Sequence, residues 1–398
     1  MNQVFRLVAL TALIHVALGA ARLDTALSAL HLGVSPALVG VLMAVYGVVS
    51  IFLAVPAGRW VDRLGVRPFL IGAPLLVVAG ELVAWRWHSL PALFVTALMI
   101  GTAWGLFYVA QQHLLGQIGG PEQRLFNFTA SSTVFGATNF LSPTIAGFVI
   151  DRLGDVDTFL AFAILPVFAW LGFAGGVVRF PPASPAAARR PSGGALRSAL
   201  SLLALPAFRQ LYLTGLYTQI VNYAFMFLVP VHAHARGWDA STTGVILGTY
   251  AIGILAIRSV TTLLARRFTP WQLIFVAMGL GVAALGGVLA FEALPLQMLC
   301  GAGLGASIGL SYPLSIVLMH DSVPEERIGE VVGLRVSLLY TTQALAPLLA
   351  GVASAVLGVS GTFVALIGLF AAAGWVARDR WDWTPPRALS AAPDNRKS

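Results

Sequence analysis

The sequence predicts an all-α integral membrane protein with twelve transmembrane helices. Of the 398 residues, 58% are hydrophobic and 10% are charged, whereas soluble domains carry roughly 25% charged residues. Apolar runs of about 20 residues, the length that crosses a bilayer as a helix, recur along the whole chain. The first run has no small-residue cleavage site before a soluble domain, so we expect a first span and not a signal peptide.

Polar loops separate the apolar runs and set the order of the predicted helices. A loop rich in charge cannot lie in lipid, because the hydrocarbon core offers no partner for exposed polar groups. Each apolar run between two such loops is therefore assigned to one helix. The predicted spans cover residues 4–28, 37–57, 69–87, 91–117, 126–150, 158–178, 208–231, 241–264, 271–292, 295–319, 328–352 and 361–377.

Arginines are concentrated in alternate loops, which predicts the orientation of the chain. The formal net charge is +8, and Lys397 is the only lysine. By the positive-inside rule, the arginine-rich loops and both termini are cytoplasmic, so the charge indicates topology and not a nucleic-acid partner. These loops hold Arg59, Arg63, Arg67, Arg124, Arg179, Arg189, Arg190, Arg197, Arg266, Arg267 and Arg327, whereas the opposite loops hold Arg86, Arg152 and Arg236.

The chain is predicted to consist of two six-helix bundles joined by a linker. Residues 181–201 are rich in proline, alanine, arginine, serine and glycine, which is typical of a solvated cytoplasmic linker. The first bundle is expected in residues 1–180 and the second in residues 202–380. Residues 381–398 are expected to form a cytoplasmic tail.

An internal repeat supports this division into halves. The tetrapeptide PEQR at residues 121–124 matches PEER at residues 324–327. Agreement over about sixty residues is expected of a duplicated unit. Pro143, Gly147 and Phe159 follow Pro121 by 22, 26 and 38 residues, and Pro347, Gly351 and Phe363 follow Pro324 by 23, 27 and 39.

The loop between the second and third predicted spans carries a recognisable motif. It reads G-x-x-x-D-R-x-G-x-R and resembles the loop signature of major facilitator superfamily transporters. The resemblance covers residues 4–377 and implies two pseudo-symmetric bundles related by an axis along the membrane normal. It also implies secondary transport by alternating access. The motif residues are Gly58, Asp62, Arg63, Gly65 and Arg67.

The sequence departs from the family pattern in two places. Ser142, Pro143 and Gly147 resemble a degenerate form of the glycine–proline motif of antiporters, with serine at the first glycine. Ala97 stands near the position where many proton-coupled drug exporters carry an arginine. The resemblance therefore does not carry the usual drug–proton relay over to this chain.

Asp62 of the loop motif is the candidate for a conformational gate. Its carboxylate is expected to accept from Arg63, Arg67 or the N-terminus of a neighbouring helix. Such a contact would form only when the halves close on the cytoplasmic side, and it would favour the outward-facing state. The alternative is a static surface pair worth less than about 1 kcal/mol.

Polar side chains within the spans are the candidates for a substrate cavity. The resemblance implies that spans 3, 6, 9 and 12 stand outside this cavity, and polar residues concentrate in the other eight spans. Buried polar groups need partners, so they should face a neighbouring helix or a wet cavity. Helix packing is the alternative role for each of them. The candidates are Tyr108, Gln111, Asn139, Gln219, Asn222, Tyr223, Arg258, Tyr312 and Gln343.

Three ionisable residues of the first span are the candidates for proton coupling. Asp24 is the possible proton acceptor, with Arg22 as its partner or as an anion contact. His15 lies deeper and titrates near neutral pH when unperturbed. The alternatives are that Arg22 and Asp24 begin the outer loop, and that His15 donates to a backbone carbonyl. Glu81, near the outer end of the third span, is expected at the membrane interface.

The motifs for catalysis and cofactor binding are not convincing. Residues 305–309 spell G-x-S-x-G, but they lie in a small-residue span and not at a strand-to-helix turn. The chain has no phosphate-binding loop, and its single cysteine, Cys300, excludes a disulfide framework. We therefore expect no enzyme, no cofactor and no metal.

The expected function is transport of a small organic solute, with proton-coupled efflux by antiport as the first hypothesis. Proton-coupled uptake of an organic anion or a sugar is the alternative. A membrane sensor or lipid-binding scaffold without transport would predict a large soluble domain or a core without a repeat. We expect a monomer in a bacterial inner membrane, with the solute, H⁺ and lipid as partners and no nucleic acid.

Overall fold

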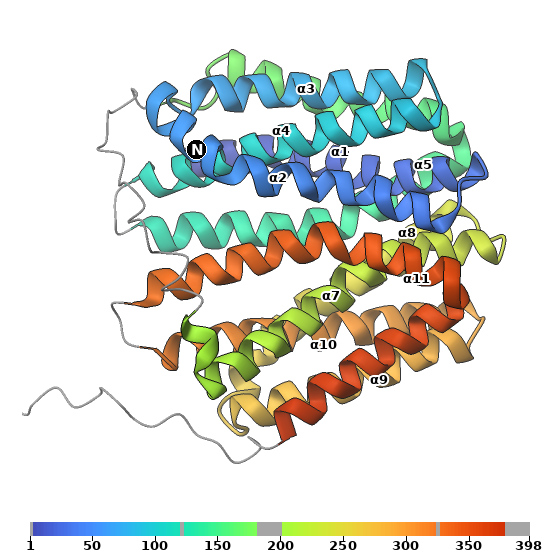
Figure 1. The fold of residues 1–398 in the computed structure, drawn as a ribbon. Helices are drawn as coiled ribbons and strands as arrows, with labels where there is room; N and C mark the ends of the chain where they lie inside the picture. The colour runs from blue at the N-terminus through green and yellow to red at the C-terminus, as the bar shows by residue number, and fades with distance from the viewer. Residues whose placement is uncertain (1–2, 120–122, 181–200, 324–326, 379–398) are drawn as a thin grey trace, which may run out of the picture.

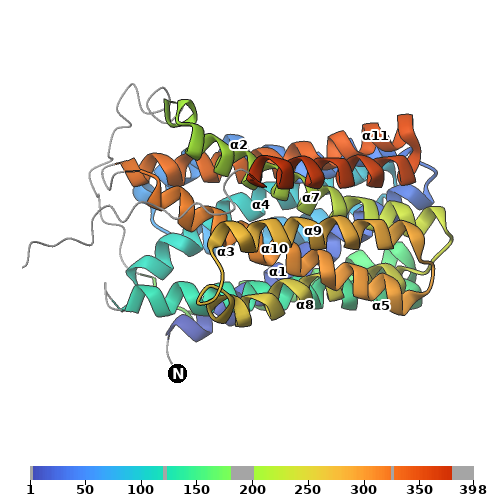
Figure 2. The same ribbon diagram turned by 90° about the horizontal axis from the view of Figure 1, so that it is seen from below.

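The computed structural model describes residues 3–119, 123–180, 201–323 and 327–378, and within them every regular element is a helix. Figures 1 and 2 show these helices side by side along one common direction. Nine helices in the described ranges are long and apolar enough to cross a membrane. The predicted linker and tail fall outside the described residues, apart from Ser201.

The helices follow the order of the predicted spans. Proline at the first or second position starts several of them, where its missing N–H is not needed. The elements are α1 (Gln3–His31), α2 (Pro36–Leu64), α3 (Arg67–Arg86), α4 (Leu90–Gln117), α5 (Arg124–Ala174), η2 (Leu202–Ala204), α7 (Pro206–Ala235), α8 (Ala240–Leu264), α9 (Pro270–Ala290), α10 (Leu294–Asp321) and α11 (Ile328–Arg378).

Helices α5 and α11 each contain a reversal of the chain. Each has 51 residues, and a straight helix of that length would extend about 77 Å, more than twice the hydrocarbon core. The break lies at Gly154 (φ 77°, ψ 169°) in α5 and at Gly358 (φ 73°, ψ 168°) in α11. Glycine adopts this positive φ without the steric cost of a Cβ. Figure 1 shows α11 turning back on itself.

The two halves repeat one backbone plan. Helix α10 begins and ends 204 residues after α4, and α11 begins and ends 204 residues after α5. The glycine breaks at Gly154 and Gly358 have the same spacing. The repeat seen in the sequence is thus also a repeat of helix lengths and turns. The boundaries expected for the two bundles remain predictions.

The halves meet along two matched pairs of helices, α2 with α11 and α5 with α8. A Cβ on Gly40 would lie 2.6 Å from the carbonyl oxygen of Pro347 and 3.1 Å from the Cα of Gly351. A Cβ on Gly244 would lie nearer still to the carbonyl oxygen of Pro143. Small residues thus let the backbones approach closely, as in other membrane bundles.

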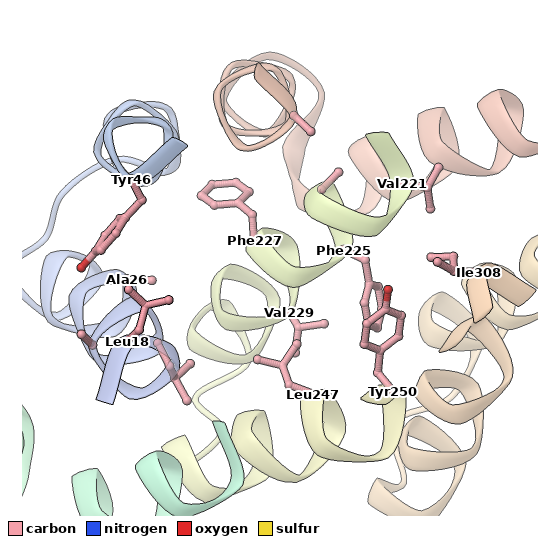
Figure 3. Packing of buried hydrophobic residues seen from close by; sticks show 14 of the residues in the cluster. Leu18, Ala26, Tyr46, Val221, Phe225, Phe227, Val229, Leu247, Tyr250 and Ile308 are labelled. Carbon is pink, nitrogen blue, oxygen red and sulfur yellow. The ribbon is translucent and has the colours of Figure 1, made fainter. Parts of the chain in front are cut away.

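Buried aromatic and aliphatic residues fill the space around α7. Figure 3 shows Tyr46 of α2 on one side of this helix and Tyr250 of α8 on the other. Both tyrosines are almost fully buried, with 2% and 3% of their surface exposed. The Phe225 ring packs 5.2 Å from the Tyr250 ring, measured between centroids. This packing fixes the α7 face on which the candidate residues lie.

Candidate functional site

Five polar side chains from both halves come together near the middle of the bundle, and we call them the central polar face. Tyr223 of α7 lies close enough to the other four for direct electrostatic interaction. All five are partly exposed. The central polar face consists of Arg22 (α1), Tyr108 (α4), Tyr223 (α7), Tyr312 (α10) and Tyr340 (α11).

Arg22 has no counter-ion among the residues that the structure describes. Its Nε and Nη2 atoms are buried without a hydrogen-bond partner. The guanidinium carbon lies 5.4 Å from the ring centroid of Tyr46, a cation–π contact. The expected pairing with Asp24 does not form, because residues two apart on a helix point in nearly opposite directions.

Asp24 instead points into the first half, where a second carboxyl group is buried. One Asp24 oxygen, Oδ1, accepts from Ser28 Oγ at 3.4 Å, and Oδ2 has no hydrogen-bond partner. Glu81 of α3 is close enough to interact with Asp24 electrostatically. Both Glu81 oxygens are buried without a partner and its exposure is 0%, so the expected position at the interface is wrong. Glu81 lies near the end of its predicted span, and no pattern in the sequence indicates that its side chain is buried.

His15 is held by a side chain and not by a backbone carbonyl. Its Nδ1 lies 2.6 Å from Thr138 Oγ1 of α5. The ring packs against Trp104 and Phe135 at centroid distances of 5.2 and 4.8 Å. The expected carbonyl partner is therefore replaced by a hydroxyl, and the imidazole is enclosed by aromatic rings. Trp104 also packs 5.5 Å from Tyr108, which connects this cluster to the central polar face.

Several predicted cavity residues make contacts within one half. Gln111 is fully buried, and its Nε2 donates to Ser131 Oγ at 3.2 Å. Asn222 accepts a hydrogen bond from the Tyr250 hydroxyl. Gln219 is buried with 3% exposure. Asn139 and Arg258 are exposed, and Gln343 is partly exposed.

Asp62 of the loop motif lies near a histidine of a neighbouring helix in this structure. Its ionisable neighbour is His113 of α4, with 3.8 Å between Asp62 Oδ1 and His113 Nδ1. Among the described residues, neither Arg63 nor Arg67 pairs with Asp62. Both arginines are exposed, so water solvates them at less cost than a fixed pair would require. His113 was missed because it lies about fifty residues away in the sequence.

The two ends of the bundle differ in how the halves meet. We call the end that carries Arg59, Arg63 and Arg67 the basic end, and the end formed by residues 32–35 and 236–239 the opposite end. At the opposite end, the Asp151 carboxylate of α5 accepts from the backbone N–H groups of Ala240 and Ser241, both at 2.9 Å. These donors begin α8, so a residue of the first half caps a helix of the second.

The close backbone contacts between halves extend from the opposite end to the middle of the bundle. A Cβ on Gly147 would come within 2.9 Å of the Cα of Ser241, and one on Gly47 would lie 2.9 Å from the Ala344 nitrogen. Nearer the basic end, a Cβ on Gly58 would meet nothing within 4 Å. The exposed fraction of Phe52 on the same helix is 73%. The close backbone contacts that these glycines make between the halves therefore lie at the opposite end and in the middle of the bundle, and Gly58 makes none nearer the basic end.

The described residues contain no group of three or more histidine, cysteine, aspartate or glutamate side chains that could hold a metal ion. A surface cavity of about 600 Å³ at the basic end is lined by residues that include Arg67 and Arg179. No member of the central polar face lines it. The two features are therefore separate places in the molecule.

Comparisons with known proteins identify relatives of this chain. A family model described as Major Facilitator Superfamily matches residues 8–347. The inner membrane transport protein YajR of Escherichia coli (strain K12) is 26% identical over 179 residues, which is 45% of this chain and 38% of that protein. The chain thus aligns with less than two thirds of the length of this relative.

Solved structures share the same fold at low sequence identity. A crystal structure of a variant of the nucleoside transporter NupG has a TM-score of 0.76 at 14% identity, covering 95% of this chain and 99% of that one. A bacterial homolog of the human lysosomal transporter Spinster, in an inward-facing and occupied conformation, has a TM-score of 0.72 at 13% identity. That comparison covers 95% of this chain and 96% of the other.

Proposed function

The chain belongs to the Major Facilitator Superfamily, and from this premise we propose that it is a secondary active transporter that moves a small organic solute by alternating access. It is a multi-pass membrane protein. We take the breaks at Gly154 and Gly358 to divide α5 and α11 into two crossings each, so that the proposed architecture has twelve crossings in two six-helix bundles. The positive-inside rule makes the basic end cytoplasmic, in a bacterial inner membrane.

The unequal contact between the halves supports this mechanism most directly. Alternating access requires two bundles that touch at one end and separate at the other. Here the Asp151 cap and the contacts of Gly147 lie at the opposite end, which we assign to the outside. This conformation is inward-facing, and the reverse motion would separate the outer contacts. Asp62 would then stabilise the closed cytoplasmic side.

Proton coupling is supported by the two carboxyl groups inside the first half. A carboxylate buried without a cation is costly, and binding of a proton removes that cost. Asp24 and Glu81 together have three oxygen atoms that are buried without a hydrogen-bond partner. We assign the proton to this pair and the direction to export, since Pro143 and Gly147 resemble part of an antiporter motif.

Uptake by proton symport is the second candidate. The observation that favours it is Arg22, whose Nε and Nη2 atoms are buried and which makes no ion pair with a described residue. An anion that enters together with one proton crosses without net charge, so the membrane potential does not oppose its accumulation.

Purified protein in proteoliposomes tests transport, coupling and direction. Labelled organic anions, cations and sugars are offered under pH gradients of either sign, with a trapped pH dye and empty liposomes as the control. Export by antiport predicts accumulation of solute in the more acidic compartment, whereas symport predicts accumulation in the more alkaline one. A solute that crosses without a pH effect would contradict proton coupling. The absence of any protein-dependent flux would contradict the transport function.

A further inference from the structure

We propose that Arg22 binds the anionic group of the transported solute, and that the surrounding tyrosines bind its aromatic or apolar body. This inference rests on the proposed transport function and names its substrate class. It predicts that the substrate is a small organic anion, with a carboxylate or phosphate as the charged group.

Among the described residues, no acidic side chain interacts electrostatically with Arg22. The groups that do so are Tyr223, Tyr46 and His15, and a phenol is neutral near pH 7. The Tyr46 ring, at 5.4 Å, supplies a cation–π contact, which replaces only part of the solvation that a buried guanidinium loses. The nearest acid in the sequence, Asp24, interacts with Asp155, Glu81 and Ser28 instead.

The Arg22 side chain is not completely covered. Nε and Nη2 are buried, whereas the residue as a whole is partly exposed. A bound solute would take the place of the groups that now cover these two nitrogens. Guanidinium donates two parallel hydrogen bonds to a carboxylate or phosphate, a geometry that an ammonium or an amide does not match.

The rest of the central polar face favours the same kind of solute. Its other four members are tyrosines, which offer ring faces and hydroxyls but no charge. Arg335 of α11 interacts electrostatically with Tyr312, and it makes no ion pair with a described residue. Positive charge therefore extends from Arg22 toward the basic end. Such a field attracts anions and disfavours cations.

A matched series of benzoate, benzamide and benzamidine isolates the effect of charge. The three compounds have similar shape and are anionic, neutral and cationic. Binding to the full-length protein in nanodiscs is measured by the shift of the thermal unfolding midpoint against ligand concentration. The wild type should bind benzoate at least tenfold more tightly than either of the other two. Equal binding of the three, or no binding of benzoate, would overturn the proposal.

Two substitutions at Arg22 and one elsewhere complete the test. Arg22→Gln should weaken benzoate binding at least tenfold and leave benzamide unchanged, and Arg22→Lys should be intermediate. Arg86→Gln, an exposed arginine at the end of a peripheral helix, should behave as the wild type. If Arg22→Gln does not fold, the weaker benzoate binding of Arg22→Lys relative to the wild type serves as the test. Benzoate binding that is unchanged in the Arg22 variants would contradict the assignment.

Tracer flux with the same proteins separates this inference from the transport function. Flux of a neutral solute that does not depend on Arg22 would keep the transporter and overturn the anion site. Benzoate binding that depends on Arg22, without flux of any solute, would keep the site and overturn the transport function.

Discussion

The two halves share one backbone plan but bury different charged groups. Matched helices repeat at a spacing of 204 residues, and Tyr46, Tyr108 and Thr138 of the first half recur as Tyr250, Tyr312 and Thr342 of the second. Four ionisable residues inside the first half do not recur. At the corresponding positions, His15, Arg22, Asp24 and Glu81 are replaced by Gln219, Met226, Leu228 and Leu285.

This difference separates two requirements of a rocking transporter. Motion about a central axis needs similar backbones on both sides, so helix lengths, breaks and close-packing glycines are duplicated. A buried charge costs free energy wherever it lies, and one set is sufficient to bind a solute and a proton. The second half therefore keeps the packing role, and the first half carries the charge.

The largest expected effect comes from the shared packing. Gly147→Leu places a side chain against the backbone of Ala240 and Ser241, and Gly351→Leu does so against Pro36 and Gly40. Both should prevent closure of the opposite end and reduce tracer flux more than tenfold. Gly279→Leu is the control, because a Cβ there meets nothing within 4 Å. If Gly147→Leu and Gly351→Leu reduced the flux to different extents, the packing at these two positions would not be equivalent.

A substitution in the loop motif should lower the rate of transport strongly without changing the stability of the inward-facing state. Asp62→Asn should lower tracer flux about tenfold, because Asp62 stabilises the outward-facing state. The thermal midpoint should barely change, since an exposed pair at 3.8 Å is worth less than about 1 kcal/mol. His113→Gln, which removes the observed partner, should lower flux less than threefold. Equal losses in both variants would instead assign the role to the pair itself.

The Asp151 cap belongs to the first half only, because the corresponding position of the second half is Ala355. Asp151→Asn removes the charge from two hydrogen bonds to the α8 N-terminus and should cost about 1 kcal/mol. The inward-facing population should fall about fivefold relative to the outward-facing one. Labelling of Ser241→Cys by a membrane-impermeant maleimide measures this change. An unchanged labelling rate would show that Asp151 does not stabilise the closed contact at the opposite end.

A smaller effect is expected at Ser28, whose hydroxyl donates to Asp24 at 3.4 Å. Ser28→Ala leaves the carboxyl group in place and removes this long, weak hydrogen bond. Proton-coupled flux should fall about twofold, with the solute affinity unchanged. A loss as large as that of Asp24→Asn would show that Ser28 is itself required for the proton site.

The sequence predicted the parts of this structure that follow from local pattern. Hydropathy located the helices, and the PEQR and PEER motifs pointed to a repeat that the helix lengths also show. The burial of Glu81 could not be predicted, because a position near a helix end does not reveal the neighbour that covers it. The His113 contact of Asp62 joins residues far apart in the chain. The roles assigned to the central polar face remain predictions, although the structure brings its members together.

The most direct test of the asymmetry compares buried ionisable groups in the two halves. Solute-driven proton movement is recorded with a trapped pH dye for the wild type, Asp24→Asn, Glu81→Gln and His232→Gln, since His232 is buried in the second half with 5% exposure. Proton movement should be lost in the Asp24 and Glu81 variants and retained in the His232 variant. Proton movement that persists without the two carboxyl groups, or that is lost only with His232, would contradict a proton site confined to the first half.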